Sequence, residues 1–121
     1  ELANRMSAAG RVECTFEATE AIEVPDTFVT GHLYRIAQEA VSNAVKHARA
    51  RHVTIRLSRA PQLLQLEIFD DGGGMTKPKS TRRGLGLGLM QHRAATIGAE
   101  LSVTSKRGEG VAVICRLPQK E

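Results

Sequence analysis

Two adjacent aspartates and three glycines end an alternating apolar segment, in the stretch EIFDDGGGM at residues 67–75. Glycine runs cost backbone entropy and neighbouring carboxylates repel each other, so the combination needs a chemical reason. A carboxylate at the end of a buried strand can accept a hydrogen bond from a ligand amine, such as the amino group of adenine. Glycines directly after it let a flat base approach the backbone. Asp70, Gly72 and Gly74 are therefore candidates for a nucleotide-base pocket.

A second glycine cluster, GLGLGLM at residues 84–90, lies just before a predicted helix. The free N–H groups at a helix start, together with the helix dipole, favour anions such as phosphate. The loop between the two clusters is basic and suited to closing over phosphates; its cations are Lys77, Lys79, Arg82 and Arg83. A dinucleotide-binding fingerprint is disfavoured, because that motif follows a strand and this cluster follows STRR.

A polar stripe on the longest predicted helix offers a third element of chemistry. Arg35, Glu39, Asn43 and Lys46 gather opposite the apolar side, with His47 at the border. Any amphipathic helix has such a face. Glu39 and Asn43, however, are four residues apart, so a carboxylate and a neutral oxygen ligand project side by side. One amide oxygen plus phosphate oxygens can hold Mg²⁺, and the carboxylate can act as a general base.

The elements that must position these residues follow from their apolar periodicity. The long helix has Asp26 or Thr27 as a plausible N-cap and Leu33, Ala37, Ala40, Val41, Ala44 and Ala48 at helical spacing. Helices are predicted at 1–9, 26–48 and from the second glycine cluster to about 97, and strands at 11–18, 52–58, 63–69, 101–105 and 111–117. This order predicts an α+β fold with a mostly antiparallel sheet and helices on one face, rather than a doubly wound parallel fold.

The whole chain of 121 residues is most simply one domain, 1–121, with an aliphatic core because only 3% of residues are aromatic. The net charge of +4 is compatible with anionic partners, but the basic residues are scattered and nucleic acid is not expected. Cys14 and Cys115 are expected to be buried, reduced thiols. The sequence opens without Met and carries neither signal peptide nor membrane span, so we expect a piece of a longer chain. This piece is expected to be cytoplasmic with no direct membrane contact of its own, and an anchor of the parent in the bacterial inner membrane is left open.

Taken together, the motifs resemble the ATP-binding domain of sensor histidine kinases, Hsp90-type chaperones, gyrase-type topoisomerases and mismatch-repair ATPases. RIAQEAVSNAVKHA resembles the N box of that family, DDGGG its first glycine box and GLGLGLM its second. Two segments are most similar in sequence to the nitrate-sensor-like histidine kinases: LYRIAQEAVSNAVKHARA, and the segment from GLGLGLM to the final strand. The resemblance covers the chain from about Leu2 to Pro118, and it implies the two-layer α/β sandwich known as the Bergerat fold.

By matching motif, the resemblance implies that Glu39 is the catalytic carboxylate, that Asn43 is the Mg²⁺ ligand and that Asp70 binds the adenine amino group. The residues implied to bind ATP and its metal are Asn43, Lys46, His47, Asp70, Gly72, Gly74, Met75, Gly84, Leu85, Gly86, Leu87 and Gly88.

Several positions depart from the family pattern. Asp71 stands where Asn is common, a change expected to be tolerated because that side chain need not touch adenine. Val111 replaces a Thr that helps to hold a water between adenine and the aspartate, so the resemblance leaves open weaker nucleotide binding. The lid lacks a phenylalanine box, as is usual in this branch. The phosphoacceptor histidine and its dimerising helices are absent; His32, His52 and His92 are interpreted as surface or structural residues.

The resemblance implies the catalytic domain of a two-component sensor histidine kinase. Its parent would transfer the γ-phosphoryl group of Mg·ATP to a histidine on a separate dimerisation domain and from there signal to a response regulator. The isolated piece is expected to bind ATP with little turnover. One alternative is an anti-sigma-factor-type serine kinase of the same fold, which grips a partner protein. Another is an α+β protein- or nucleic-acid-binding domain, which predicts no ATP affinity.

Overall fold

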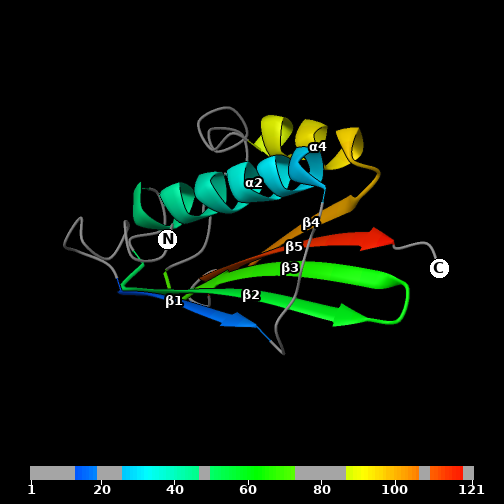
Figure 1. The fold of residues 1–121 in the computed structure, drawn as a ribbon. Coiled ribbons are helices and arrows are strands. Elements are labelled where there is room, and N and C mark those ends of the chain that lie inside the picture. The colour runs from blue at the N-terminus through cyan, green and yellow to red at the C-terminus, as the bar shows by residue number, and fades with distance from the viewer. Residues whose placement is uncertain (1–12, 19–25, 47–49, 73–86, 107–109, 119–121) are drawn as a thin grey trace.

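Two helices cover one face of a five-stranded sheet (Figure 1). The computed structural model describes residues 13–18, 26–46, 50–72, 87–106 and 110–118, so the helix predicted at 1–9 lies outside the described residues. The elements are β1 (Glu13–Ala18), α2 (Thr27–Lys46), β2 (His52–Ala60), β3 (Leu63–Asp70), α4 (Leu87–Thr96), β4 (Glu100–Lys106) and β5 (Gly110–Pro118).

The strand order in the sheet is β1-β2-β3-β5-β4. The edge strand β1 runs parallel to β2, whereas β2–β3, β3–β5 and β4–β5 are antiparallel. The prediction of a mixed, mostly antiparallel sheet with helices on one face is therefore confirmed. None of the helices in the described part of the chain is long and apolar enough to cross a membrane.

Helix α2 begins where the sequence predicts. The Oδ1 atom of Asp26 accepts hydrogen bonds from the backbone N–H groups of Phe28 (2.9 Å) and Val29 (3.3 Å), so Asp26 is the N-cap. Between this cap and Lys46, one side of the helix is buried at helical spacing: Leu33, Ile36, Ala37, Ala40, Val41 and Ala44. Ala48, expected on the same side, lies outside the described residues.

The turn between β2 and β3 and the end of the second helix each contain a residue with positive φ. A two-residue turn joins β2 to β3, with Ala60 paired to Leu63 and Gln62 at φ 70°. The two strands are each slightly longer than predicted, because Arg59 and Ala60 belong to β2 and Asp70 to β3. Helix α4 starts inside the second glycine cluster and is followed by Gly98 at φ 79°, the left-handed conformation that favours glycine after a helix.

The core lies between the helix layer and the facing side of the sheet. Met90 and Ala94 of α4 join the buried side of α2 above alternate residues of three strands. These strand residues are Val53, Ile55, Leu64, Leu66, Ile68, Val113, Cys115 and Leu117. Both cysteines are free, as expected, and burial raises the pKa of the Cys115 thiol to about 11.

The edge strand β1 is more exposed than its alternation predicts. Cys14 is half-buried, but Phe16 is 55% exposed. Phe16 is exposed because β1 pairs with β2 at the rim of the sheet. On the neighbouring strands, the sheet face away from the helices carries polar contacts instead. There Arg56 contacts Glu17 at 3.0 Å and lies 5.4 Å from the centre of the Phe69 ring.

Candidate functional site

Asp70, the last residue of β3, is held by backbone donors from two directions. Its Oδ1 accepts hydrogen bonds from the N–H groups of Gly72 (2.8 Å) and Val111 (3.3 Å). Burial raises the pKa of Asp70 above its ordinary value, while these two hydrogen bonds act in the opposite direction. Both fixed donors meet one oxygen, and Oδ2 accepts no hydrogen bond from the described residues. The carboxylate is thus oriented through one oxygen by two backbone donors.

Gly110 lets β5 begin directly against the end of β3. Its φ is 86°, and a Cβ atom built on it would lie far inside van der Waals contact of the Asp70 carbonyl oxygen. Only glycine fits this close approach without moving the backbone. Val111, which follows, contributes its backbone N–H to Asp70. In the sequence, Gly110 and Val111 were notable only as a departure from a family pattern. The structure shows that they bring the start of β5 against Asp70.

Asp71 fastens the residue after β3 to the start of β2. Its Oδ1 accepts hydrogen bonds from the N–H groups of Arg51 (2.8 Å) and His52 (2.9 Å), and its Oδ2 lies 2.8 Å from Nδ1 of His52. The hydrogen bond from the His52 backbone is the largest reason why the pKa of Asp71 falls to about 2, with the His52 side chain and Arg51 adding to it. Asp71 therefore has a structural role that the sequence did not indicate.

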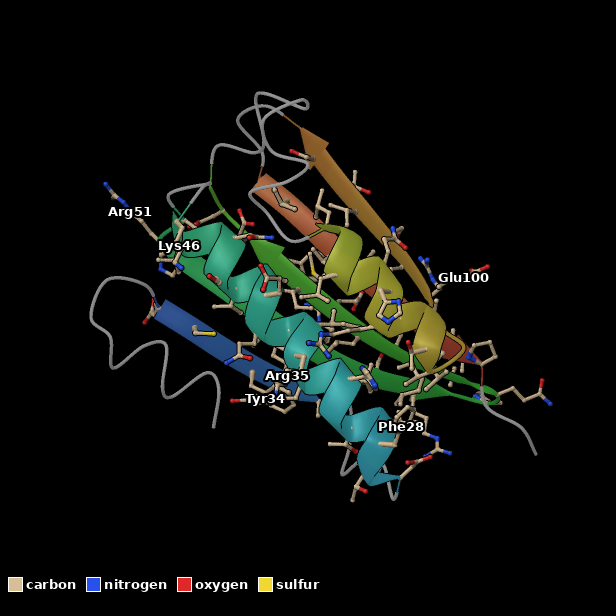
Figure 2. The ribbon with its side chains drawn as sticks, turned by 90° about the horizontal axis from the view of Figure 1, so that it is seen from above. Phe28, Tyr34, Arg35, Lys46, Arg51 and Glu100 are labelled. Atoms are coloured by element: carbon tan, nitrogen blue, oxygen red, sulfur yellow. The ribbon has the colours of Figure 1, made fainter. Side chains whose placement is uncertain are left out.

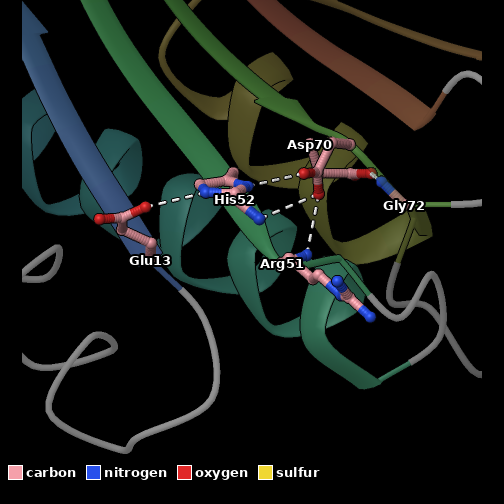
Figure 3. A network of polar contacts seen from close by, with 6 residues as sticks. Glu13, Arg51, His52, Asp70 and Gly72 are labelled. Atoms are coloured by element: carbon pink, nitrogen blue, oxygen red, sulfur yellow. Dashed lines mark hydrogen bonds and ion pairs between the residues drawn. The ribbon is translucent and has the colours of Figure 1, made fainter.

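His52 links this carboxylate to the edge strand, as Figure 3 shows for Glu13, His52 and Arg51. Nε2 of His52 lies 2.8 Å from Oε1 of Glu13 on β1. The pKa of His52 is raised, first by its hydrogen bond to Asp71 and further by both carboxylates. The sequence interpretation of His52 as a surface or structural residue missed the network, because its partners lie on other elements and no local pattern joins them.

The C-terminal end of α2 lies at the same end of the molecule as Asp70. After the helix, the N–H of Ala50 donates to the carbonyl of Ala44 (3.0 Å), and the next residue, Arg51, is held by Asp71. Glu39 and Asn43 are half-buried on α2, and Lys46 is exposed at its last position. The fold thus places this end of the polar stripe beside the end of β3.

The second glycine cluster is described only at its end. Leu87 opens α4 and packs partly buried against the core, and Gly88 is exposed with open space where a Cβ would stand. Packing among the described residues therefore does not require glycine at 88. The basic lid cations lie outside the described residues. So do six other predicted site residues: His47, Gly74, Met75, Gly84, Leu85 and Gly86.

Mg²⁺ fits this donor set only as a shared ion. Nowhere in the described ranges do three or more His, Cys, Asp or Glu side chains gather to hold a metal. The amide oxygen of Asn43 is the kind of hard ligand that Mg²⁺ accepts, and Mg²⁺ usually completes its shell with phosphate oxygens and water. The arrangement therefore suits a metal that arrives with a nucleotide rather than one bound by the protein alone.

Comparison with known proteins places these features in a family context. Residues 29–121 match the family model described as histidine kinase-, DNA gyrase B- and HSP90-like ATPase. The chain is 36% identical over 90 residues to the sensor histidine kinase LiaS of Bacillus subtilis, covering 74% of this chain and 25% of LiaS. It is 39% identical over 88 residues to the histidine-protein kinase/phosphatase UhpB of Salmonella typhimurium, covering 73% of this chain and 17% of UhpB. The chain thus spans about a quarter or less of these curated relatives.

Solved structures share the fold at lower identity. The ATP binding domain of PrrB from Mycobacterium tuberculosis superposes with a TM-score of 0.75 at 21% identity, over 99% of this chain and 90% of that chain. The blue-light activated histidine kinase EL346 of Erythrobacter litoralis gives a TM-score of 0.77 at 23% identity, over 97% of this chain and 39% of that chain. These matches confirm the predicted α+β architecture.

Proposed function

Because this chain belongs to the histidine kinase-, DNA gyrase B- and HSP90-like ATPase family and is an ATP-binding domain of the sensor histidine kinase type, we propose that it binds Mg·ATP and supplies the γ-phosphoryl group to a histidine on a separate domain. The observation that carries this proposal is Asp70. Its carboxylate is half-buried at the end of β3, held through one oxygen by Gly72 and Val111, with the other oxygen open to a donor.

The exocyclic amino group of adenine is a suitable donor for that oxygen. A buried carboxylate gains most from a ligand hydrogen bond where water is excluded, and hydrogen bonds to charged groups contribute about 1.5–3 kcal/mol. Gly72 is buried and has no side chain, so a flat ring can lie close to the backbone there. The backbone N–H of Val111 holds Asp70 without a hydroxyl, which supports a working base pocket despite the missing Thr.

The phosphate end of the nucleotide is assigned to α2 and the second glycine cluster. Asn43 would hold Mg²⁺ jointly with phosphate oxygens, and the metal would neutralise charge that develops on them. Lys46 at the end of α2 adds a cation. Together with His47, Gly84, Gly86 and Gly88, it would position the triphosphate.

Glu39 is assigned to the transfer step. A ring nitrogen of the accepting histidine forms a bond to the γ-phosphorus, while the bond from phosphorus to the bridging oxygen breaks and ADP leaves with that electron pair. The other ring nitrogen loses its proton, and Glu39, one helical turn before Asn43, is suited to accept it. Positioning and charge stabilisation are the main demands of such a transfer.

The accepting histidine belongs, in this proposal, to the dimerisation domain of a longer parent chain. That parent would pass the phosphoryl group to a response regulator in the cytoplasm. The names of the relatives favour this assignment over a serine kinase of the anti-sigma-factor type, since both LiaS and UhpB are described as histidine kinases.

Calorimetric titration with Mg·ATP and Mg·ADP tests the proposal. We expect binding in the micromolar to millimolar range, and we expect Asp70→Ala and Asp70→Asn to weaken it by about 10-fold to 100-fold, because each loses a charged hydrogen bond. Asn43→Ala should weaken binding only when Mg²⁺ is present.

The matched control is Glu100→Ala, which removes an exposed carboxylate at the other end of the sheet and should leave affinity unchanged. Circular dichroism confirms that each variant is folded. A folded wild-type chain that binds neither nucleotide, or an Asp70→Ala variant that binds as well as the wild type, would rule out the proposed site.

A further inference from the structure

A hollow of about 380 Å³ lies between the two helices, away from the candidate nucleotide site. It is lined by Thr27, Phe28, Gly31, His32 and Arg35 of α2 and by Arg93 of α4. We name it the α2–α4 hollow. Figure 2 shows Phe28 near the N-terminal end of α2 and Lys46 at the opposite end. At 1.5 Å per residue these two positions are about 27 Å apart. The hollow comes nearest to the candidate nucleotide site at Arg35, which is one helical turn before Glu39 on α2.

The charged residues that line the α2–α4 hollow are both cations. Glu39 follows Arg35 by one helical turn on α2, and no ion pair joins these two described residues. Arg35 and Arg93 come from different helices and line the same space, and no lining residue is acidic. Neither guanidinium forms an ion pair with any residue in the described ranges. Asp26, the nearest acidic residue before the hollow, is engaged as the N-cap of α2. Two unpaired guanidinium groups beside one concave space match a carboxylate or phosphate, which they can bind in a bidentate manner.

His32 and Phe28 add polar and apolar character to the same wall. The Nδ1 atom of His32 is buried and has no hydrogen-bond partner among the residues described. The Phe28 ring meets the His32 ring edge-on, with centroids 4.8 Å apart, yet 56% of Phe28 remains exposed. A large exposed aromatic ring is unfavourable on a solvated surface, and a bound partner would cover the Phe28 ring.

We propose that the α2–α4 hollow is a docking site for a protein segment that presents a carboxylate beside an apolar side chain. The carboxylate meets Arg35 and Arg93, and the apolar side chain packs on Phe28. Charge complementarity selects an acidic partner, and the exposed Phe28 ring selects a protein over a small inorganic anion. Arg and aromatic residues are also those most often found at the centre of protein interfaces. Docking there needs no nucleotide.

Selection from a displayed library of random 12-residue peptides, carried out without nucleotide, tests this inference. We expect the peptides selected by the wild-type chain to share Asp or Glu within four positions of Leu, Ile or Phe. A synthetic copy of the best peptide should bind at least about tenfold more weakly to Arg35→Gln/Arg93→Gln and to Phe28→Ala. The matched control is Arg59→Gln, which removes an exposed cation on β2 that lines no part of the hollow and should leave the affinity unchanged.

Two results would overturn the proposal. One is the absence of a shared acidic and apolar pattern among the selected peptides, and the other is equal binding of the best peptide by the double arginine variant and the wild type. Titration with acetate and inorganic phosphate provides a further test. If either small anion shifts the NMR amide signals around Arg35 and Arg93 while no peptide does, the hollow is a small-anion site rather than a protein docking site.

Discussion

Asp70 and Asp71 are neighbours in the chain with opposite electrostatic surroundings. Asp70 is half-buried, and burial raises its pKa, whereas Asp71 is exposed and its pKa falls to about 2. The Oδ1 atom of Asp70 accepts two backbone hydrogen bonds, and its Oδ2 atom is the proposed acceptor for a ligand. Both carboxylate oxygens of Asp71 contact Arg51 or His52, and these contacts fix the backbone directly after Asp70. Two adjacent like charges that look costly in the sequence thus have different roles, a proposed ligand contact for Asp70 and a structural contact for Asp71.

Replacing His52 with Gln should remove a pH-dependent contribution to folding stability. Because the pKa of His52 is raised in the fold, its contribution is complete below the ordinary value of 6.5 and is lost as the pH rises through the raised pKa. Because the pKa of Asp71 is lowered to about 2, its contribution is present above 3.8 and lost as the pH falls toward 2. We therefore expect the wild type to exceed His52→Gln in Tm by a few degrees between pH 3.8 and 6.5, and by less above that range.

Thermal unfolding followed by circular dichroism from pH 3 to 9 measures this difference. His92→Gln, on the exposed side of α4, is the control and should show no such profile. A difference between wild type and His52→Gln that is constant with pH, or largest at pH 9, would contradict the ion-pair network.

Helix α2 carries the proposed catalytic residues near one end and its cap at the other. Asp26 holds the first turn, and Lys46 ends the helix beside the strand that contains Asp70. Since the buried side of α2 is fixed against the sheet, loosening the first turn should not move Glu39 or Asn43. A mutation of the N-cap is therefore expected to change the stability of the helix without changing the proposed nucleotide site.

Asp26→Ala should lower the free energy of unfolding by about 1 kcal/mol, within a range of about 0.5–2 kcal/mol, and leave the affinity for Mg·ATP unchanged. Thermal unfolding should show a decrease in Tm of about 2–8 °C. Asp26→Asn retains a side-chain acceptor and should lose much less. Equal losses in Asn and Ala variants would show that the cap hydrogen bonds do not stabilise the helix.

Most elements were predictable because their apolar spacing is local. The buried side of α2, the β2–β3 turn and the end of α4 near Gly98 can all be read from neighbouring residues. The exposure of Phe16 could not be predicted, because alternation does not reveal that β1 is an edge strand. The roles of Asp71 and Gly110 could not be predicted either, since both depend on which strands and loops meet across the fold.

The whole molecule presents two separate surfaces along α2. The polar end of the stripe lies beside Asp70, and the α2–α4 hollow lies toward the other end of the helix. The proposed function, transfer of a phosphoryl group to another protein, requires both a nucleotide site and a surface that binds the partner. We expect substitutions at Phe28 and Arg93, which are farthest from Glu39 and Asn43, to leave nucleotide affinity unchanged.

The chain alone should incorporate almost no phosphate from γ-labelled ATP, because the proposed function places the accepting histidine on another domain. Adding a purified dimerisation domain of a histidine kinase of this branch should give acid-labile labelling of that domain, lost in Glu39→Gln. The measurement is autoradiography after gel electrophoresis. Stoichiometric labelling of the chain itself, on any of its four histidines, would contradict this assignment.

Within the described residues, β1 pairs with β2 alone, and the residues that it meets stand far along the chain. Glu17 and Arg56 are 39 positions apart, whereas two residues join β2 to β3. Closing the longer loop costs on the order of 3 kcal/mol of chain entropy. We therefore expect the β2–β3 hairpin to form before β1 joins β2 and before β5 joins β3, whose paired residues Phe69 and Ala112 are 43 positions apart. The contact between Glu13 and His52 is expected to form with these later pairings.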